Sequence, residues 1–323
     1  MLVFKRTLLH AALLGAGMLG LVAAPVQAAG PMVKTQAPGY YRMMVGDIEV
    51  TALSDGTVGL PVTKLINNQP AAETEKALAR SYLRDPVETS VNTYLINTGS
   101  RLVMVDTGAG GFFGPTLGKL QASIRAAGYA PEQIDEIYIT HMHSDHVGGL
   151  LADGKPAFAN AVVRADQRDA DFWLSQAAMD KAPDEAKGFF KAAMATVGAY
   201  QAAGRFKAFD GNTELVSGVR AQVAYGHTPG HSTYVVESKG EKLVLWGDLM
   251  HVAAVQFAKP MLTIVFDSDN AAAAAQRAKA YADAAEQGHW VGSTHLSFPG
   301  MGRLRANGDG GYTFIPAVYR AVP

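Results

Sequence analysis

The sequence predicts an α/β fold with layered sheets, and two observations carry this prediction. Segments rich in β-branched and aromatic residues occur early and again in the last third of the chain, and helix-type segments separate them. No internal repeat, low-complexity linker or charge block divides the sequence after residue 28. We therefore expect residues 29–323 to form a single domain, a sandwich of helices and sheets.

Strand and helix signals follow one another along this domain. Strands are expected over 40–56, in two runs over 90–108 split by the turn "NTGS", and over 134–140, with helices over 71–83 and 115–127. Two more helices are expected over 165–179 and 184–203, with a break at 175–183. The last third predicts strands at 219–226, 232–238, 242–248 and 289–293, and an alanine-rich helix that begins at Asp269 or Asn270 and ends near Gly288.

The first 28 residues predict an export signal. A short basic start, the apolar run "TLLHAALLGAGMLGLVAA" and the small residues "VQA" favour cleavage after Ala28. A membrane anchor is the alternative, but His10 and several glycines interrupt the apolar run, which barely reaches spanning length. The mature chain is therefore expected to be periplasmic or secreted, with no membrane association after cleavage.

Composition limits the classes of partner. The chain has 323 residues, of which 18% are charged, and its net charge is −1 with no block of lysine or arginine. This balance gives no electrostatic footprint for nucleic acid or an anionic membrane, so the expected partner is a small molecule. The absence of cysteine excludes disulfides, thiolate metal ligands and cysteine nucleophiles. Neither G-x-S-x-G nor S-x-x-K occurs, which disfavours a serine hydrolase.

The stretch "THMHSDHVGG" is the strongest functional signal. Four metal-ligating side chains occupy six positions at the end of an expected strand: His141, His143, Asp145 and His146. His141 and His143 are two residues apart on a strand end, so they would project to the same side and converge on one ion. The next two ligands lie just past the strand, where a loop can turn them toward a second ion. Gly148 and Gly149 then leave the backbone free to bend.

Further ligands are expected at other strand ends. The candidates are His227 or His231 in "YGHTPGHS", Asp248 in "LVLWGD" and His295 in "GSTH". Metal sites in α/β folds collect ligands from the ends of several strands, so these residues support one another. The residue pattern by itself does not choose between the two histidines of "HTPGH".

The motif H-x-H-x-D-H, followed by "HTPGH", "GD" and a late histidine, closely resembles the metallo-β-lactamase superfamily, whose early structural aspartate is matched by Asp106 in "DTG". The resemblance implies a four-layer αβ/βα sandwich with two divalent metal ions at one edge. It implies as ligands His141, His143 and His227 for one ion, Asp145, His146 and His295 for the other, and Asp248 as the bridge. His231 would then have a supporting role. Zn²⁺ suits this donor set best, although cobalt, manganese or iron could bind it.

Longer stretches, among them "APGYYRMMVGDIEVTALSDGTVGLP" and "YVVESKGEKLVLWGDLMHVAAVQF", resemble the methyl parathion hydrolase group of phosphotriesterases and aryl lactonases. The resemblance implies an aromatic wall for a flat substrate, made by Phe113, Trp173 and Phe189. It also implies a pocket lining near the metals, made by Leu65, His251, Ile264 and Phe266. At the last four positions, and at the helix start "APDEAKGFF", the chain departs from dedicated phosphotriesterases and is similar to the lactonase type.

The expected reaction is therefore the opening of dihydrocoumarin-like lactones. A hydroxide shared between two ions would attack the carbonyl, since metal binding lowers the pKa of water to roughly 7 in favourable sites. Asp145 and Asp248 would orient that hydroxide, and His251 would assist by hydrogen bonding. Weak organophosphate hydrolysis is expected beside it. The alternatives are phosphotriesterase as the main activity, another esterase or lactonase of this fold, or a non-catalytic metal-binding protein. The sequence leaves the oligomeric state open, a homodimer included.

Overall fold

The computed structural model describes residues 30–319 and residue 321. The expected export signal therefore lies outside the described residues and stays a prediction. The chain divides into a segment that ends at Gln36 and a compact unit that begins at Ala37, and residues 30–36 contain no helix or strand. None of the helices in the described part is both long enough and apolar enough to span a bilayer.

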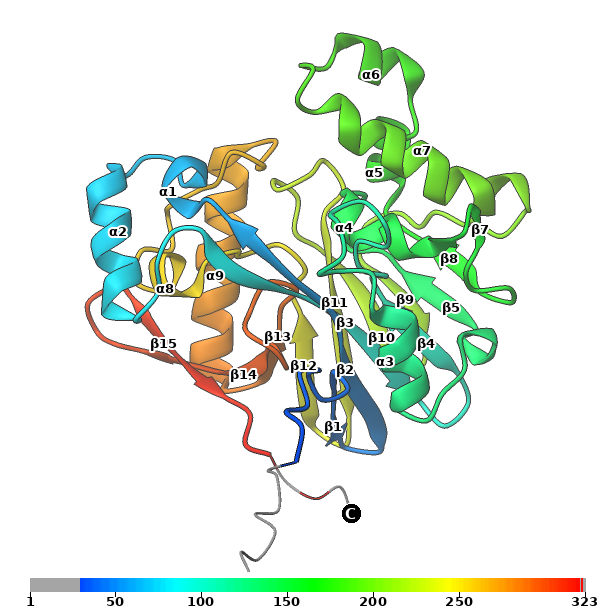
Figure 1. The fold of residues 1–323 in the computed structure, drawn as a ribbon, viewed down its shortest axis with the longest axis horizontal. Helices are drawn as coiled ribbons and strands as arrows, with labels where there is room; N and C mark the ends of the chain where they lie inside the picture. Colours follow the sequence, from blue (N-terminus) through cyan, green and yellow to red (C-terminus); the bar gives the residue numbers. More distant parts are fainter. Residues whose placement is uncertain (1–29, 320, 322–323) are drawn as a thin grey trace, which may run out of the picture. The chain divides into compact units, whose positions relative to one another are not determined.

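The unit that begins at Ala37 contains two large mixed sheets and a short hairpin (Figure 1). The first sheet has the order β1-β2-β3-β4-β5-β8, with bounds Tyr40–Val45, Ile48–Leu60, Val87–Asn97, Leu102–Val105, Glu136–Tyr138 and Val162–Arg164. The second has the order β15-β14-β13-β12-β11-β10-β9, with bounds Tyr312–Pro316, Met301–Ala306, Trp290–Gly292, Glu241–Leu245, Ser232–Ser238, Val219–Val223 and Thr213–Val216. The hairpin pairs β6 (Leu151–Ala152) with β7 (Lys155–Pro156).

Nine α-helices connect these strands within the described residues. They are α1 (Val62–Leu65), α2 (Ala71–Arg80), α3 (Leu120–Ala126), α4 (Ser144–Val147), α5 (Gln167–Trp173), α6 (Gln176–Lys181), α7 (Lys187–Ala202), α8 (Ala253–Gln256) and α9 (Asn270–Gln287). Short 3₁₀ turns occupy Pro131–Gln133 and Gly148–Leu150. In α9, the Asp269 side chain accepts a hydrogen bond from the Ala272 backbone at 3.0 Å, and Gly288 ends the helix in the left-handed conformation, as expected from the sequence.

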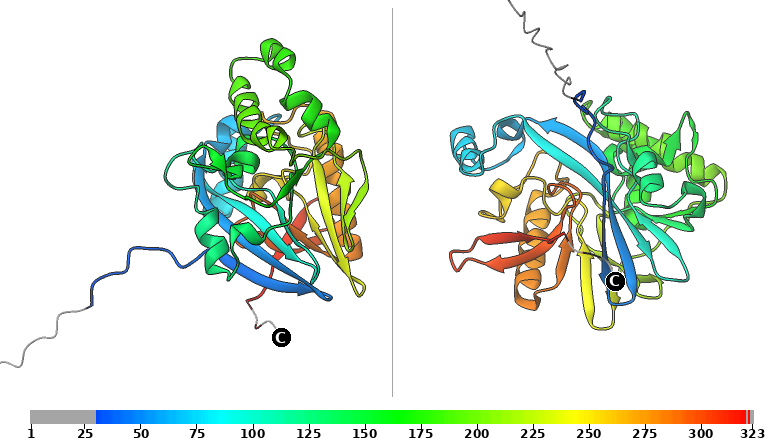
Figure 2. Two further views of the ribbon diagram at one scale, coloured as in Figure 1. Left: turned by 90° about the vertical axis from the view of Figure 1, so that its right-hand side faces the viewer. Right: turned by 60° about the horizontal axis from the view of Figure 1, so that its bottom comes forward.

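Three apolar layers hold the sheets and helices together. Residues of both sheets meet in a central core, which includes Val50, Ile96 and Val103 from the first sheet and Tyr234, Val236 and Leu243 from the second. A second cluster joins the first sheet to α3, α5 and α7, and a third joins the second sheet to α9. The turned views show strands of the first sheet, in blue and cyan, beside the yellow strands of the second (Figure 2). The expected α/β sandwich, with helices outside both sheets, is confirmed.

Two local predictions need correction, and one hairpin was missed. The helix expected over 115–127 begins only at Leu120, because the preceding residues form turns. The segment 175–183, expected as a break, contains α6, which begins because the Ser175 hydroxyl accepts from the Ala178 backbone at 3.2 Å. The hairpin β14–β15 was not predicted, although the sequence "NGDGG" between these strands is a strong turn signal.

Candidate metal centre

The histidine motif is built differently from the sequence-based prediction. Strand β5 ends at Tyr138, so His141 and His143 lie in the following loop rather than on the strand. The next two ligand-type residues belong to the short helix α4, where His143 is the N-cap. Asp145 and His146 are therefore presented by the first turn of a helix, and the centroid of the His146 ring lies 4.0 Å from that of His141.

The glycine pair after the motif serves close packing rather than backbone bending. A Cβ on Gly148 would lie 2.1 Å from the Ala109 carbonyl oxygen, and one on Gly149 would lie 1.9 Å from that of Thr107. Gly148 has an ordinary helical φ of −61°. Any side chain at either position would push α4 away from the loop that carries Asp106.

The other expected ligands come from loops of the second sheet. His227 lies between β10 and β11, Asp248 follows β12, and His295 follows β13. These three side chains are buried, with exposed fractions of 7% or less. The loops bring them to the histidine motif of the first sheet, so the site spans both halves of the sandwich.

Seven predicted side chains meet in two overlapping groups of possible metal ligands. The first group is His141, His143, His227 and Asp248, and the second is Asp145, His146, Asp248 and His295. Within each group the ligand atoms lie within 4.8 Å of one another. Asp248 belongs to both groups, with Oδ1 3.3 Å from His146 Nε2 and Oδ2 3.5 Å from His227 Nε2. A carboxylate in this position can bridge two ions.

The donor atoms at the centre fit divalent cations. His141 Nε2, His146 Nε2 and Asp248 Oδ1 are buried, and none has a hydrogen-bond partner. His143 Nδ1 lies 3.2 Å from His227 Nε2. If both rings are neutral, a hydrogen bond forms between these two nitrogens only when one of them carries the proton. Buried, converging nitrogen and carboxylate lone pairs are costly unless a cation binds them. The residues present therefore match two ions of the kind that imidazole and carboxylate prefer.

Hydrogen bonds fix the second ring nitrogen of several ligands. The pairs are His146 Nδ1 with Asp106 Oδ2 (2.8 Å), His227 Nδ1 with Asp267 Oδ1 (2.8 Å) and His295 Nδ1 with the Ser90 carbonyl (3.0 Å). Each ring N–H donates to its oxygen, which leaves Nε2 as a lone-pair donor toward the centre. Asp106, expected as a structural aspartate, thus orients a ligand, whereas no sequence signal marked the role of Asp267.

His231 lies beside the centre but outside both groups. Its Nε2 accepts from the Asp248 backbone N–H at 3.1 Å, and its Nδ1–H donates to the Ala224 carbonyl at 3.2 Å. Burial lowers the pKa of His231 to about 3, so the ring stays neutral and Nε2 remains an acceptor. The structure therefore places His227 among the candidate ligands and His231 behind Asp248, which the two groups share.

Without ions the electrostatics of the two groups differ. Burial, together with neighbouring imidazoles, lowers the pKa of His141 and of His143 well below the usual value. Burial also opposes charge on His146, but the three carboxylates near it raise its pKa well above that value. For Asp248 burial opposes ionisation as well, yet the surrounding histidines hold its pKa well below its usual range. Asp248 therefore stays negatively charged among several imidazoles, an arrangement that favours the binding of a cation.

A cavity of about 260 Å³ opens beside the metal centre. Its wall contains four of the residues predicted to contact substrate: Phe113, Phe189, His251 and Phe266. Trp173 lies in the wall of an adjoining cavity of about 870 Å³, which shares His143, Phe189 and Phe266 with the first.

Two predicted pocket residues, Leu65 and Ile264, line neither cavity. Ile264 is fully buried, and its backbone forms a β-bridge with that of Ile66. Val58, Leu60 and Leu117 were missed but line the smaller cavity. The alternating run at the end of β2 was a signal for the first two.

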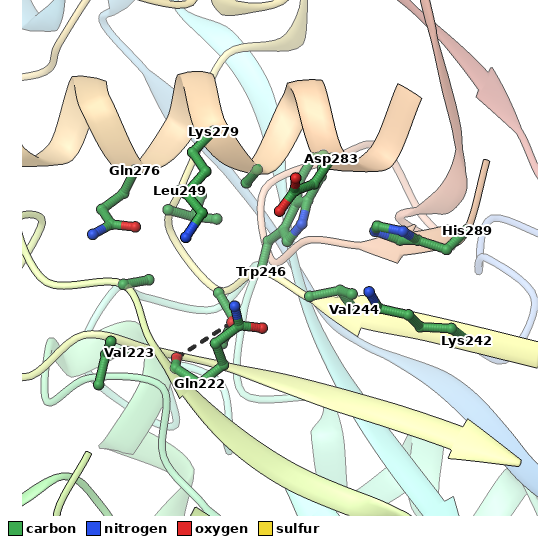
Figure 3. A pocket seen from close by; sticks show the side chains of 13 residues that line it. Gln222, Val223, Lys242, Val244, Trp246, Leu249, Gln276, Lys279, Asp283 and His289 are labelled. Carbon is green, nitrogen blue, oxygen red and sulfur yellow. Dashed lines mark hydrogen bonds between the residues drawn. The ribbon is translucent and has the colours of Figure 1, made fainter. Parts of the chain in front are cut away.

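A third cavity lies between α9 and the strands β10 and β12 of the second sheet (Figure 3). Its volume is about 60 Å³, room for only a few water molecules. Lys242, Asp283 and His289 contribute to its polar lining. This cavity is too small for an organic substrate.

A mixed α/β sandwich that carries two overlapping His/Asp ligand groups beside an apolar cavity defines a metal-dependent hydrolase. The family model described as "Metallo-beta-lactamase superfamily" matches residues 86–285. The chain belongs to this superfamily, and its fold and enzymatic class are those predicted.

Relatives within the superfamily include lactonases. The chain is 35% identical to "hydrolase AbOPH in beta lactamase superfamily", with a TM-score of 0.84, covering 89% of this chain and all of that one. It is 27% identical to AidC, a dizinc quorum-quenching lactonase solved with the product N-hexanoyl-L-homoserine, with a TM-score of 0.81 and coverage of 88% and 99%. N-acyl homoserine lactonases from Bacillus cereus and a Bacillus species are each 26% identical, over 38% and 58% of this chain. These matches span 40% and 74% of the Bacillus proteins.

Proposed function

We propose that the protein is a two-metal hydrolase whose substrates are aryl lactones of the dihydrocoumarin type. One observation carries this proposal: the two ligand groups open directly into a cavity of about 260 Å³ walled by Phe113, Phe189 and Phe266. Aromatic walls suit a flat fused ring that presents its carbonyl to the metal centre. The lactonases among the relatives support the reaction class.

The reaction depends on the metal centre, which activates water and the carbonyl group, and on the leaving group of the substrate. Two bound divalent ions supply an activated water molecule and polarise the carbonyl of the lactone. Asp145 and Asp248 present carboxylate oxygens to the metal centre, and Asp248 lies between the two groups of histidines. The leaving group of an aryl lactone is a phenolate with a pKa of about 10, so ring opening needs no dedicated acid residue.

His251 is placed to orient the bridging carboxylate. Its Nε2 lies 3.1 Å from Asp248 Oδ2, and its ring stacks on His295 with centroids 5.1 Å apart. Burial lowers the pKa of His251, so at neutral pH the ring is uncharged and donates a single N–H. Since His251 also lines the cavity, it contacts both the metal ligands and the space for substrate.

A second substrate class is N-acyl homoserine lactones. The adjoining cavity of about 870 Å³ is mainly apolar and continues from the metal centre past Phe189 and Phe266, which offers room for an acyl arm. Phosphotriesters such as methyl parathion are proposed as weak substrates only, because Phe266 and His251 narrow the site around a tetrahedral phosphorus centre.

A rate panel tests the proposal. Zinc-loaded protein should turn over dihydrocoumarin with a higher kcat/KM than either N-hexanoyl-homoserine lactone or methyl parathion, and chelation should abolish all three activities. Phe113→Ala should raise KM for dihydrocoumarin, whereas the matched variant Phe112→Ala should not, because Phe112 is half exposed and does not line the cavity. Fastest turnover of methyl parathion would make the protein a phosphotriesterase. Bound metal without turnover of any ester would leave a metal-binding protein.

A further inference from the structure

Asp169 connects the two loops that supply the first group of ligands. It lies on α5, and its side chain is 1% exposed. Its Oδ2 accepts from the Met142 backbone N–H at 2.9 Å, and its Oδ1 accepts from the Gly230 backbone N–H at 2.6 Å. Met142 stands between His141 and His143, and Gly230 follows His227 by three residues. One buried carboxylate therefore ties the first sheet's ligand loop to that of the second.

The contact on the Gly230 side leaves no room for adjustment. A Cβ on Gly230 would lie 2.4 Å from the Asp169 backbone nitrogen and 2.9 Å from the Asp169 Cβ. The start of α5 is also held by Asp166, whose carboxylate caps the helix at Arg168 and accepts from the Tyr225 hydroxyl at 3.0 Å. The loop that carries His227 is thus packed against α5 from both sides of that histidine.

The chemistry of this contact requires a carboxylate. Both backbone partners of Asp169 are N–H donors, and an ionised carboxylate offers an acceptor on each side. An asparagine would turn its NH₂ group toward one of those donors, and a shorter side chain would reach only one loop. Each lost contact leaves a buried backbone N–H unsatisfied.

We propose that Asp169 is a positioning residue that sets the spacing between the His141–His143 loop and the His227 loop and so completes the ligand set of one of the two ions. His143 Nδ1 and His227 Nε2, which come from these two loops, lie 3.2 Å apart. The second group depends on other supports, because His146 is held by Asp106 and His295 by the Ser90 carbonyl. Loss of Asp169 should therefore weaken one ion selectively.

The inference rests on the two-ion centre of the proposed function and not on the identity of the substrate. The experiment uses the full-length Asp169→Asn variant, with Asp171→Asn as control, since Asp171 is an exposed aspartate on the same helix. Zinc-loaded proteins are dialysed against increasing chelator, and metal per chain is counted. Cobalt-loaded samples report by absorption which ligand set is lost, and circular dichroism of the metal-free forms reports folding.

The Asp169→Asn protein should lose one ion at a chelator concentration about 10- to 100-fold lower than wild type and keep the other, and Asp171→Asn should match wild type. Release of both ions together, or release of neither at lower chelator, would overturn the inference. Should Asp169→Asn fail to fold, the Gly230→Ala variant tests the inference instead. The added Cβ separates the same loop from α5 and should release the same ion at lower chelator. Wild-type protein that binds two ions but opens no lactone would refute the proposed function and leave this test intact.

Discussion

Replacing Asp267 by asparagine separates two roles that the structure gives to one buried carboxylate. Oδ1 accepts from His227 Nδ1 at 2.8 Å, and Oδ2 accepts from the Ile264 backbone at 3.1 Å. Oδ2 also lies 3.6 Å from Nη2 of Arg277, and the side chains of this ion pair are both fully buried. The carboxylate therefore orients a metal ligand and balances a buried guanidinium.

The expected magnitudes follow from these two contacts. Breaking a buried ion pair costs about 3–5 kcal/mol, and the lower end applies because Arg277 also donates to the carbonyls of Leu249, Pro260 and Leu262. Loss of a charged acceptor behind a ligating histidine lowers metal affinity about 10- to 100-fold. Asp267→Asn should therefore lose about 3 kcal/mol in the metal-free state and bind one of its two ions more weakly.

Urea unfolding of the metal-free protein and chelator competition measure the two effects separately. The double variant Asp267→Asn with Arg277→Met removes the unpaired charge, so it should recover part of the stability but none of the metal affinity. Unfolding free energy within about 0.5 kcal/mol of wild type, together with unchanged zinc affinity, would refute this reading of the contacts.

Two further predictions concern buried side chains outside the ligand set. Burial lowers the pKa of His289 to about 4, so the folded state resists protonation of this ring and loses stability as the pH falls from about 6.5 toward 4. In urea titrations of the metal-free proteins, the unfolding free energy of wild type relative to His289→Gln should fall by up to about 2 kcal/mol between pH 7.5 and 5. A difference that stays constant with pH would contradict this prediction. The Asp55 carboxylate lies at a β-bulge and accepts hydrogen bonds from the backbone of Ala109, Gly118 and Leu120. Asp55→Asn should therefore release the loop that carries Phe113, which should lower the unfolding free energy by about 1–3 kcal/mol and raise KM for dihydrocoumarin more than it lowers kcat. A variant with wild-type stability and KM would show that other contacts hold this loop.

The candidate metal ligands could be found in the sequence because their signal is local. His141 to His146 carry four ligand types in one short motif, and the distant ligands follow strands that the residue pattern also reveals. The loops after β5, β12 and β13 then converge because the sheets face each other across the central core. Local pattern and tertiary packing agree at these positions.

The supports behind the ligands could not be predicted in the same way. Asp267, Asp169 and Asp55 stand in the sequence as ordinary acidic residues, and only packing shows that each accepts buried N–H groups. Leu65 and Ile264 were inferred as pocket residues from the resemblance alone, and neither lines the two cavities beside the metal centre. Ile264 is fully buried, and its backbone pairs with that of Ile66.

The most direct measurement is anomalous diffraction at the zinc edge from crystals of the zinc-loaded protein. Two peaks are expected about 3.5–4 Å apart, each with ligand distances of about 2.0–2.2 Å. Their ligands should be His141, His143 and His227 for one, Asp145, His146 and His295 for the other, and Asp248 for both. A single peak, or peaks away from these side chains, would contradict the two-metal assignment.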